Sequence, residues 1–211
     1  RKLNIISLED PIEFIHHSKE SQVIQRELYT HIPSFSEGVR AALREDPDVI
    51  LVGELRDAET IRWAMTAAET GHLVLGTLHT TGAIKTIDRI IDALPADERE
   101  QTKSFLAQSL LAVITQALVK GPDQRSRKAV CEIMVINRAI SKLIMTDQTH
   151  QILSQLQTGR SLGMGTLDQA LLEGIQQKRL DPDDAYLYAN DKQLFTRHVT
   201  DASILPKLDL N

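Results

Sequence analysis

The stretch Val49-Ile50-Leu51-Val52-Gly53-Glu54 decides how the rest of the sequence is interpreted. Four apolar residues without polar alternation predict a strand that is buried on both faces, as in a parallel sheet. Asp46-Pro47-Asp48 breaks the amphipathic segment in front of it. At the carboxyl end of the strand, Gly53 lets the main chain approach a ligand closely and Glu54 supplies a carboxylate.

Strand and helix patterns of the same kind lie on both sides of this stretch. Leu3–Leu8 and Leu73–Leu78 predict two further strands, and helices are expected from Ser36 to about Glu45, from Asp57 to Gly71, and from about Gly82 to Ala93. Ser36 and Asp57 are the expected N-caps. Three strand–helix repeats predict an α/β fold, a doubly wound parallel sheet flanked by helices.

The second half of the chain predicts a mostly helical C-terminal region. Apolar residues at spacings of three and four predict one helix over Asp97–Lys120. A loop over Gly121–Lys128 and a strand over Ala129–Ile136 follow, and the remainder indicates short helices broken at Gly159–Gly165 and at Asp181-Pro182. We therefore expect a core over residues 1–136 and a helical region over residues 137–211.

Composition excludes several classes of protein. The 211 residues carry 24 basic and 29 acidic side chains, a net charge of −5 that argues against a nucleic-acid-binding surface. No apolar run approaches the roughly 18 residues of a membrane span, so direct membrane insertion is not expected. A single cysteine excludes an internal disulfide and a four-cysteine zinc site, and it favours the cytoplasm. Because Arg1-Lys2-Leu3-Asn4 leads straight into a strand, we expect a piece of a longer protein.

Reactive residues follow the three predicted strands. Glu9, Asp10 and Glu13 follow the first strand, Glu54 and Arg56 the second, and His79 the third, which His72 precedes. Carboxylates, imidazoles and hydroxyls at one sheet edge suit a Mg²⁺–phosphate site, where a carboxylate also orients the attacking water. Arg40, Arg44 and Arg56 either form surface salt bridges or reach a phosphate across a subunit boundary.

A phosphate-binding loop is missing from this set. No stretch fits G-x-x-x-x-G-K-[ST], the loop whose main-chain amides and lysine cradle phosphates. The Gly-rich segment Gly159–Gly165 lacks the lysine and indicates a turn between helices. These 211 residues alone are therefore not expected to hold ATP well.

Three motifs, in order and at matching spacing, resemble those of the hexameric ATPases of the secretion superfamily. Ile6–Phe14 resembles their Asp box, Leu43–Asp57 their atypical Walker B motif, and Thr66–His72 through Gly76–Thr81 their His box. Within the superfamily, the chain is most similar to the PilT-type pilus retraction motors of twitching motility.

The resemblance implies a RecA-like fold, a homo-hexameric ring, and ATP hydrolysis with Mg²⁺ coupled to pilus disassembly. Glu13 would polarise the attacking water, Glu54 would act on Mg²⁺ through water, and His79 would sense the γ-phosphate with His72 as its partner. The implied nucleotide-binding candidates are Glu9, Asp10, Arg40, Arg44 and Arg56. The implied partners are a platform protein of the inner membrane and a paralogous retraction ATPase, so that the motor is cytoplasmic and peripheral to that membrane.

Two departures from the family keep alternatives open. The Walker A loop of such motors would lie upstream of Arg1. Their signature Ala-Ile-Arg-Asn-Leu-Ile-Arg-Glu is replaced here by Ala139-Ile140-Ser141-Lys142-Leu143-Ile144-Met145-Thr146, so two arginines and the terminal acid are gone. The alternatives are a PilU-like accessory subunit, a non-catalytic scaffold of the ring, and the ATPase of a related secretion system.

Overall fold

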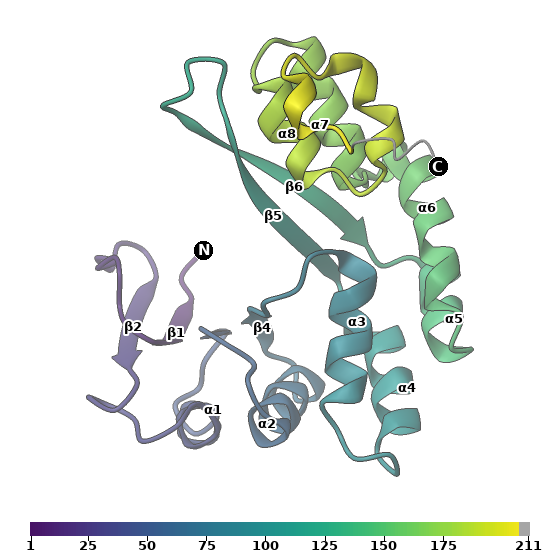
Figure 1. Cartoon of the computed structure of the whole chain (residues 1–211). Helices are drawn as coiled ribbons and strands as arrows, with labels where there is room; N and C mark the ends of the chain where they lie inside the picture. Colours follow the sequence, from purple (N-terminus) through teal and green to yellow (C-terminus); the bar gives the residue numbers. More distant parts are fainter. Residues whose placement is uncertain (207–211) are drawn as a thin grey trace. The chain divides into compact units, whose positions relative to one another are not determined.

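The computed structural model describes residues 1–206 as two compact units (Figure 1). Unit 1 comprises residues 1–79 and 89–109, and unit 2 comprises residues 80–88 and the chain from residue 110 onward. The domain boundary predicted after residue 136 falls inside unit 2, and the last five residues of the predicted helical region lie outside the described part.

Unit 1 is built on a four-stranded parallel sheet. Its strands are β1 (Asn4–Glu9), β2 (Gln22–Glu27), β3 (Val49–Val52) and β4 (Leu73–Gly76), in the spatial order β2-β1-β3-β4. Ile6 of β1 pairs with Ile50 of β3, which pairs in turn with Val74 of β4. The predicted parallel α/β sheet is confirmed. Strand β2 was missed by the sequence analysis, because Gln22–Glu27 is half polar and lies at the sheet edge.

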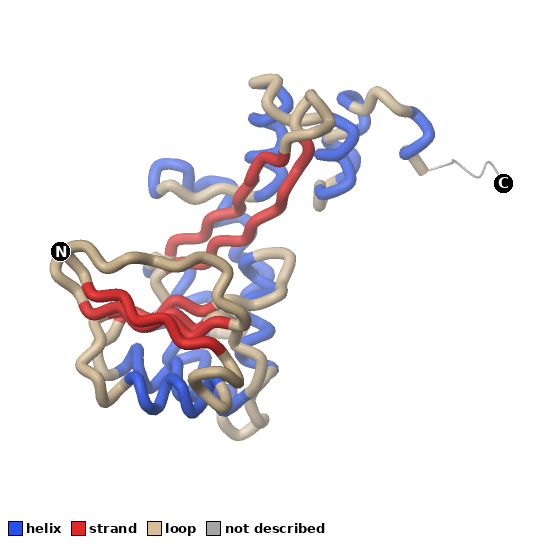
Figure 2. The backbone as a smooth tube through the Cα atoms, turned by 90° about the vertical axis from the view of Figure 1, so that its left-hand side faces the viewer, coloured by secondary structure: helices blue, strands red, loops and turns tan. Residues whose placement is uncertain are grey.

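Helices α1 (Phe35–Ala42) and α2 (Ala58–Glu69) cover one face of this sheet, as Figure 2 shows. The apolar cluster between them and the strands contains Ile6, Leu8, Leu28, Ile32, Phe35, Val39, Ala42, Ile50, Val52 and Ala67. The connection from β1 to β2, residues 10–21, is a loop rather than a helix. The doubly wound prediction is therefore corrected, because α1 and α2 share one face.

The ends of these helices follow local capping chemistry. The N-cap of α1 is Ser34 and not Ser36, since Ser34 Oγ accepts a hydrogen bond from Glu37 N at 3.1 Å. The predicted cap of α2 is confirmed, with Asp57 Oδ1 accepting from Thr60 N at 2.8 Å. After α2, Gly71 takes a φ of +99°, a conformation that favours glycine.

Strand β4 is an edge of the described sheet and is not buried, contrary to the prediction. The exposed fractions are 43% for Leu73 and 48% for Leu75. Helix α3 (Ala83–Asp92) and helix α4 (Arg99–Ser109) follow it along the chain, and unit 1 takes in the end of α3 and all of α4.

Unit 2 contains an antiparallel hairpin that replaces half of a predicted helix. Strands β5 (Ala112–Lys120) and β6 (Arg127–Val135) pair over nine residues each. The single helix predicted over Asp97–Lys120 is wrong beyond Ser109. The β-branched residues Val113 and Val119 are buried while Ile114 is exposed, an alternation with a period of two that suits a strand.

The rest of unit 2 is helical, as predicted. It comprises α5 (Arg138–Met145), α6 (Ile152–Thr158), α7 (Leu167–Gln176) and α8 (Pro182–Tyr188), with 3₁₀ turns at Thr149–Gln151, Gly159–Leu162, Lys192–Leu194, Thr196–His198 and Ala202–Ile204. Its core joins the hairpin to α7, α8 and the chain beyond through Val119, Val130, Leu171, Leu180, Ala185, Tyr186, Ala189 and Phe195. Within residues 1–206, no helix has both the length and the apolar character required to cross a bilayer.

Candidate functional site

The carboxyl ends of β1, β3 and β4 form one edge of the sheet in unit 1. Strand β2 lies on one side of β1 in the sheet, and the next strand along the chain, β3, lies on the other side of β1. The direction of the connections therefore reverses between β1 and β3, and this is a topological switch point, where ligands of open α/β sheets bind. Gly53 N donates to Leu8 O at 2.7 Å, and Leu55 N donates to Thr77 O at 2.9 Å. The Thr77 hydroxyl donates to Gly53 O. These bonds fix the segments that follow the strands relative to one another.

Four charged or titratable side chains meet at this edge, and we refer to Asp10, Glu54, Arg56 and His79 as the Glu54 cluster. The Arg56 guanidinium bridges two carboxylates, through a hydrogen bond to Glu54 and an ion pair with Asp10 Oδ2 at 3.3 Å. His79 Nε2 lies 3.3 Å from Glu54 Oε1. Arg56 also packs over the Phe35 ring, 6.0 Å from its centroid. The structure thus brings together four of the predicted site residues.

The side chains of the cluster differ in solvent exposure, from the largely buried carboxylate of Glu54 to the exposed imidazole of His79. The side chain of Glu54 is 20% exposed and that of His79 is 86% exposed. The hydrogen bond to Glu54 raises the pKa of the Arg56 guanidinium, and the carboxylate of Asp10 acts in the same direction. Arg56 therefore stays a fixed positive charge, while His79 is accessible to a ligand that approaches the sheet edge.

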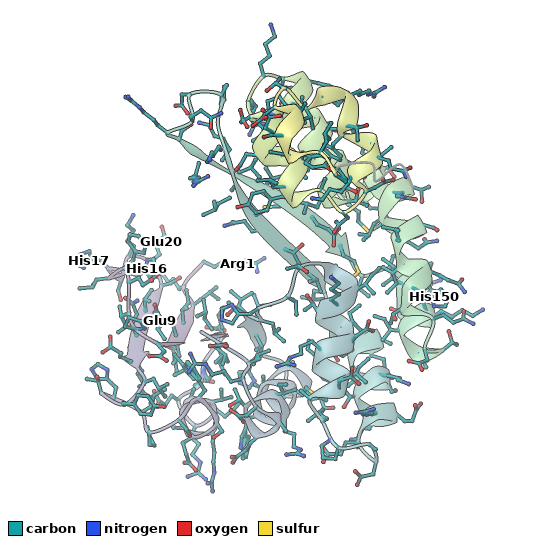
Figure 3. All side chains as sticks on the ribbon, viewed as in Figure 1. Arg1, Glu9, His16, His17, Glu20 and His150 are labelled. Atoms are coloured by element: carbon teal, nitrogen blue, oxygen red, sulfur yellow. The ribbon has the colours of Figure 1, made fainter. Side chains whose placement is uncertain are left out.

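The remaining acidic residues of the first motif lie toward β2. Glu9 Oε1 accepts hydrogen bonds from Ser7 Oγ at 2.6 Å and from Gln25 Nε2 at 2.8 Å. Figure 3 shows Glu9 near the loop that carries His16, His17 and Glu20. Glu13 is exposed in the same loop, and in the described residues no hydrogen bond or ion pair joins it to the Glu54 cluster.

Three further predicted site residues also lie apart from the cluster. His72 is at the opposite, amino end of β4, with its Nδ1 2.9 Å from Ala67 O and 3.0 Å from Thr70 Oγ1. Arg40 lies on α1, where it pairs with Glu37 at 3.5 Å and stacks on Trp63. Arg44 is exposed just after the same helix.

The carboxylate oxygens of the cluster suit a magnesium ion that is held jointly by the protein and by the phosphates of a nucleotide. In residues 1–206, no group of three or more His, Cys, Asp and Glu side chains is arranged to hold a metal by itself. Mg²⁺ at nucleotide sites takes only one or two protein carboxylates and completes its shell with water and phosphate oxygens. The carboxylate of Glu54 matches that requirement.

Two residues of this edge were missed by the sequence analysis as site residues. Phe35 supports the Arg56 guanidinium, and the Thr77 hydroxyl connects the ends of β4 and β3. An aromatic residue at the start of an amphipathic helix indicates core, so the sequence carried no signal for Phe35. Thr77 lies near the end of the strand predicted over Leu73–Leu78 and directly follows the observed strand β4, and this place at a strand end was the available signal.

The comparisons with known proteins identify the family of the chain. The sequence profile of the Type II/IV secretion system protein family matches residues 1–181. The chain is 53% identical over 190 residues to a twitching motility protein of Neisseria gonorrhoeae, covering 90% of this chain and 51% of that protein. It is 55% identical over 177 residues to the type IV pilus retraction ATPase PilT of Pseudomonas aeruginosa, covering 84% of this chain and 51% of PilT.

A solved structure supports the fold. A crystal structure of the pilus retraction motor PilT with bound ADP superimposes with a TM-score of 0.85 at 41% identity, over 93% of this chain and 55% of that chain. The chain spans about half the length of the relatives that it matches. The chain belongs to the Type II/IV secretion system protein family.

Proposed function

We propose that this chain is the C-terminal part of a PilT-like ATPase, which hydrolyses ATP with Mg²⁺ to drive type IV pilus retraction in twitching motility. The observation that carries the proposal is the Glu54 cluster at the switch point of a parallel sheet. A protected carboxylate, a fixed guanidinium and an exposed imidazole at one edge suit phosphoryl transfer, in which positioning and charge stabilisation supply most of the catalysis. The similarity to retraction ATPases supports the same reaction.

Each residue has a role in this proposal. Glu13 polarises the attacking water, Glu54 holds Mg²⁺ through water, and His79 contacts the γ-phosphate from its exposed position. Mg²⁺, when bound, neutralises charge on the phosphates. Arg56 orients the Glu54 carboxylate through its hydrogen bond while it also pairs with Asp10.

The other predicted residues act from further away. His72 holds the end of α2 from the amino end of β4, through its contact with Ala67 O. Glu9 is hydrogen bonded toward β2 and supports the first motif rather than the phosphates. Arg40 and Arg44, both exposed on or next to α1, face a nucleotide or a neighbouring subunit.

The phosphates of ATP need a cradle that these 211 residues do not contain, since no segment fits the Walker A pattern. We infer that a segment outside this sequence supplies it and that the chain alone hydrolyses no ATP. The proposed working form is a homo-hexamer in the cytoplasm, bound to a platform protein of the inner membrane and alongside a paralogous retraction ATPase. The acidic net charge of −5 is consistent with protein rather than nucleic-acid partners.

A PilU-like accessory role is a second candidate, and one observation favours it. Helix α5 and its C-cap Thr146 carry the segment Ala139–Thr146, in which the two arginines and the final acid of the retraction-motor signature are replaced. Met145 of this segment is 52% exposed, where the signature has an arginine. An accessory subunit would hydrolyse ATP by the same site but would not sustain retraction by itself. The ATPase of a related secretion system shares the same chemistry and differs in its partner.

The test uses the full-length protein that contains this chain, with ATP hydrolysis measured by phosphate release and nucleotide binding measured by calorimetry. Glu54→Gln and Glu13→Gln are each expected to lower kcat about 100-fold or more while nucleotide still binds, because the charge of a base or metal ligand is removed without a change of shape. The matched control is Glu100→Gln, an exposed glutamate in the first turn of α4 and outside the three motifs, which is expected to leave kcat unchanged.

Two outcomes decide against the proposal. Wild-type turnover in Glu54→Gln would refute the assignment of the site, and a loss below about tenfold in Glu13→Gln would show that Glu13 is not the base. Binding of an ATP analogue by the 211-residue chain at micromolar concentration would show that a segment within it cradles the phosphates. The accessory role would be favoured if the full-length protein hydrolyses ATP normally while cells that contain it as their single retraction ATPase do not twitch.

A further inference from the structure

Packing within the loop over residues 10–21 does not fix the position of Glu13. Glu13 lies in the first half of this loop, and the two apolar residues that follow it are not packed. Phe14 is 74% exposed and Ile15 is 77% exposed. Because burial does not anchor this part of the loop, directional hydrogen bonds have to hold it.

Those hydrogen bonds come from strand β2. In the parallel register, Gln25 is paired with Ser7 and Glu27 with Glu9, so Gln25 and Glu27 point to the same face of the sheet. Both side chains are half-buried there, below the loop. We refer to Gln25 and Glu27 together as the β2 clamp.

Gln25 makes three hydrogen bonds with one amide group. Its Nε2 donates to Glu9 Oε1 and to the Phe14 carbonyl, both at 2.8 Å, and its Oε1 accepts from His16 N at 2.7 Å. Only a primary amide combines two donors and an acceptor in this geometry. Gln25 therefore ties the end of β1 to the main chain on the carboxyl side of Glu13.

Glu27 holds the other side of Glu13. Its Oε2 accepts from Ile12 N at 3.0 Å, and its Oε1 accepts from Thr30 Oγ1 at 3.0 Å. The hydrogen bond from Ile12 N, followed by that from Thr30, lowers the pKa of Glu27, so the side chain is an ionised acceptor at neutral pH. The residues on both sides of Glu13 are thus bonded to one strand.

We propose that Gln25 and Glu27 are positioning residues, which hold the loop so that Glu13 meets the attacking water. This inference rests on the proposed function of Glu13 as the residue that polarises that water. Catalytic groups lose activity steeply when they are displaced, by about 100-fold for an error of about 1 Å. The clamp therefore acts on kcat, while the binding of ATP depends on other residues.

The experiment compares clamp variants in the full-length protein. Gln25→Leu removes all three hydrogen bonds, and Glu27→Ala removes the bond to Ile12; each is expected to lower kcat by about 10- to 100-fold with KM for ATP within about threefold. Glu27→Gln keeps an oxygen that accepts from Ile12 N and is expected to recover most of the activity lost in Glu27→Ala. The matched control is Gln22→Leu, an exposed glutamine on the other face of the same strand.

A second measurement keeps the proposal testable if a variant is poorly folded. Hydrogen exchange in the 211-residue chain is expected to be faster at the His16 amide in Gln25→Leu, and at the Ile12 amide in Glu27→Ala, than in Gln22→Leu. Fluorescence of Trp63 in α2 reports whether unit 1 remains folded.

The outcomes separate this inference from the proposed function. A slow Glu13→Gln enzyme together with a Gln25→Leu enzyme as fast as Gln22→Leu would refute the clamp alone. A Glu13→Gln enzyme with wild-type kcat would refute the role of Glu13, and the proposal that the clamp positions Glu13 for catalysis would be refuted as well. If kcat and the urea midpoint of unit 1, followed by Trp63 fluorescence, fall together in the clamp variants, then Gln25 and Glu27 have a structural role only. That result would also refute the clamp.

Discussion

Gly53 joins β3 to Glu54 at a point that leaves no room for a side chain. A Cβ at this position would lie 2.7 Å from Leu8 O and 3.3 Å from Glu9 Cα. Both are main-chain atoms, and Leu8 O also accepts the hydrogen bond from Gly53 N at 2.7 Å. To restore an ordinary contact of 3.4 Å, the Gly53→Ala variant must separate β1 and β3 by about 0.7 Å.

The magnitude follows from that displacement. A separation of about 0.7 Å takes the Gly53–Leu8 hydrogen bond beyond its normal length and removes about 1 kcal/mol. Overpacking adds about 1–3 kcal/mol. We expect the free energy of unfolding of unit 1 to fall by about 2–4 kcal/mol, which lowers the urea midpoint by about 1–2 M. Trp63, the single tryptophan, lies in α2 and makes its fluorescence a direct assay of this unit.

Gly76→Ala is the matched control at the end of the neighbouring strand. Its Cβ would lie 2.7 Å from Leu55 Cδ1 and 3.0 Å from Leu55 Cγ, which are atoms of one flexible side chain that is able to turn aside. We expect a loss below about 1 kcal/mol. If Gly53→Ala unfolds at the same urea concentration as Gly76→Ala, the reasoning from main-chain contact at Gly53 is refuted.

Three further predictions use the same chain. Ser34→Ala is expected to destabilise unit 1 by about 1 kcal/mol and Ser36→Ala by less, because Ser34 caps α1; equal midpoints of Trp63 fluorescence in urea would contradict this. Ile50→Ala, in the fully buried centre of β3, is expected to lose about 2–5 kcal/mol by the same assay, and a loss under 1 kcal/mol would count against its place in the core. The hydroxyl of Thr200, with the main-chain amide of Thr200 acting in the same direction, lowers the pKa of Asp183. The stability from that contact is therefore present above the usual carboxyl pKa and is lost as the pH falls through the lowered one. An NMR titration of the Thr200 amide should show a midpoint below 3.8, and Asp183→Asn should abolish it.

Local patterns predicted the parts of the fold that depend on nearby residues. Strand β3 was recognisable from four consecutive apolar residues, and α2 from Asp57 at its start and Gly71 after its end. Strand β2 was not recognisable, because the half-polar segment Gln22–Glu27 becomes a strand only by pairing with β1. Strand β5 was taken for helix, since Leu110, Leu111, Ile114 and Leu118 fit a helical spacing while the pairing with β6 imposes a different one.

Some positions in the candidate site could likewise be predicted from the sequence, and others could not. That Glu54 and His79 lie at one edge follows from the rule that parallel strands end together, and the structure brings them to 3.3 Å. The position of His72 could also have been read from the sequence. The four residues of β4 lie between it and the carboxyl edge, and at about 3.3 Å per residue they span roughly 13 Å. The bridging position of Arg56 could not be predicted, because it depends on how the segments after β1 and β3 are bonded.

The exposed edge at β4 has a consequence for how the isolated chain behaves at high concentration. An edge strand offers unpaired main-chain groups to any other extended segment, and here it also presents two leucines to solvent. Its length of only four residues limits this tendency, since short edges make poor templates for aggregation. Stretch Leu73–Gly76 is accordingly the segment where self-association of the purified chain would begin, and a lysine in place of Leu75 is the simplest way to keep the solution monodisperse.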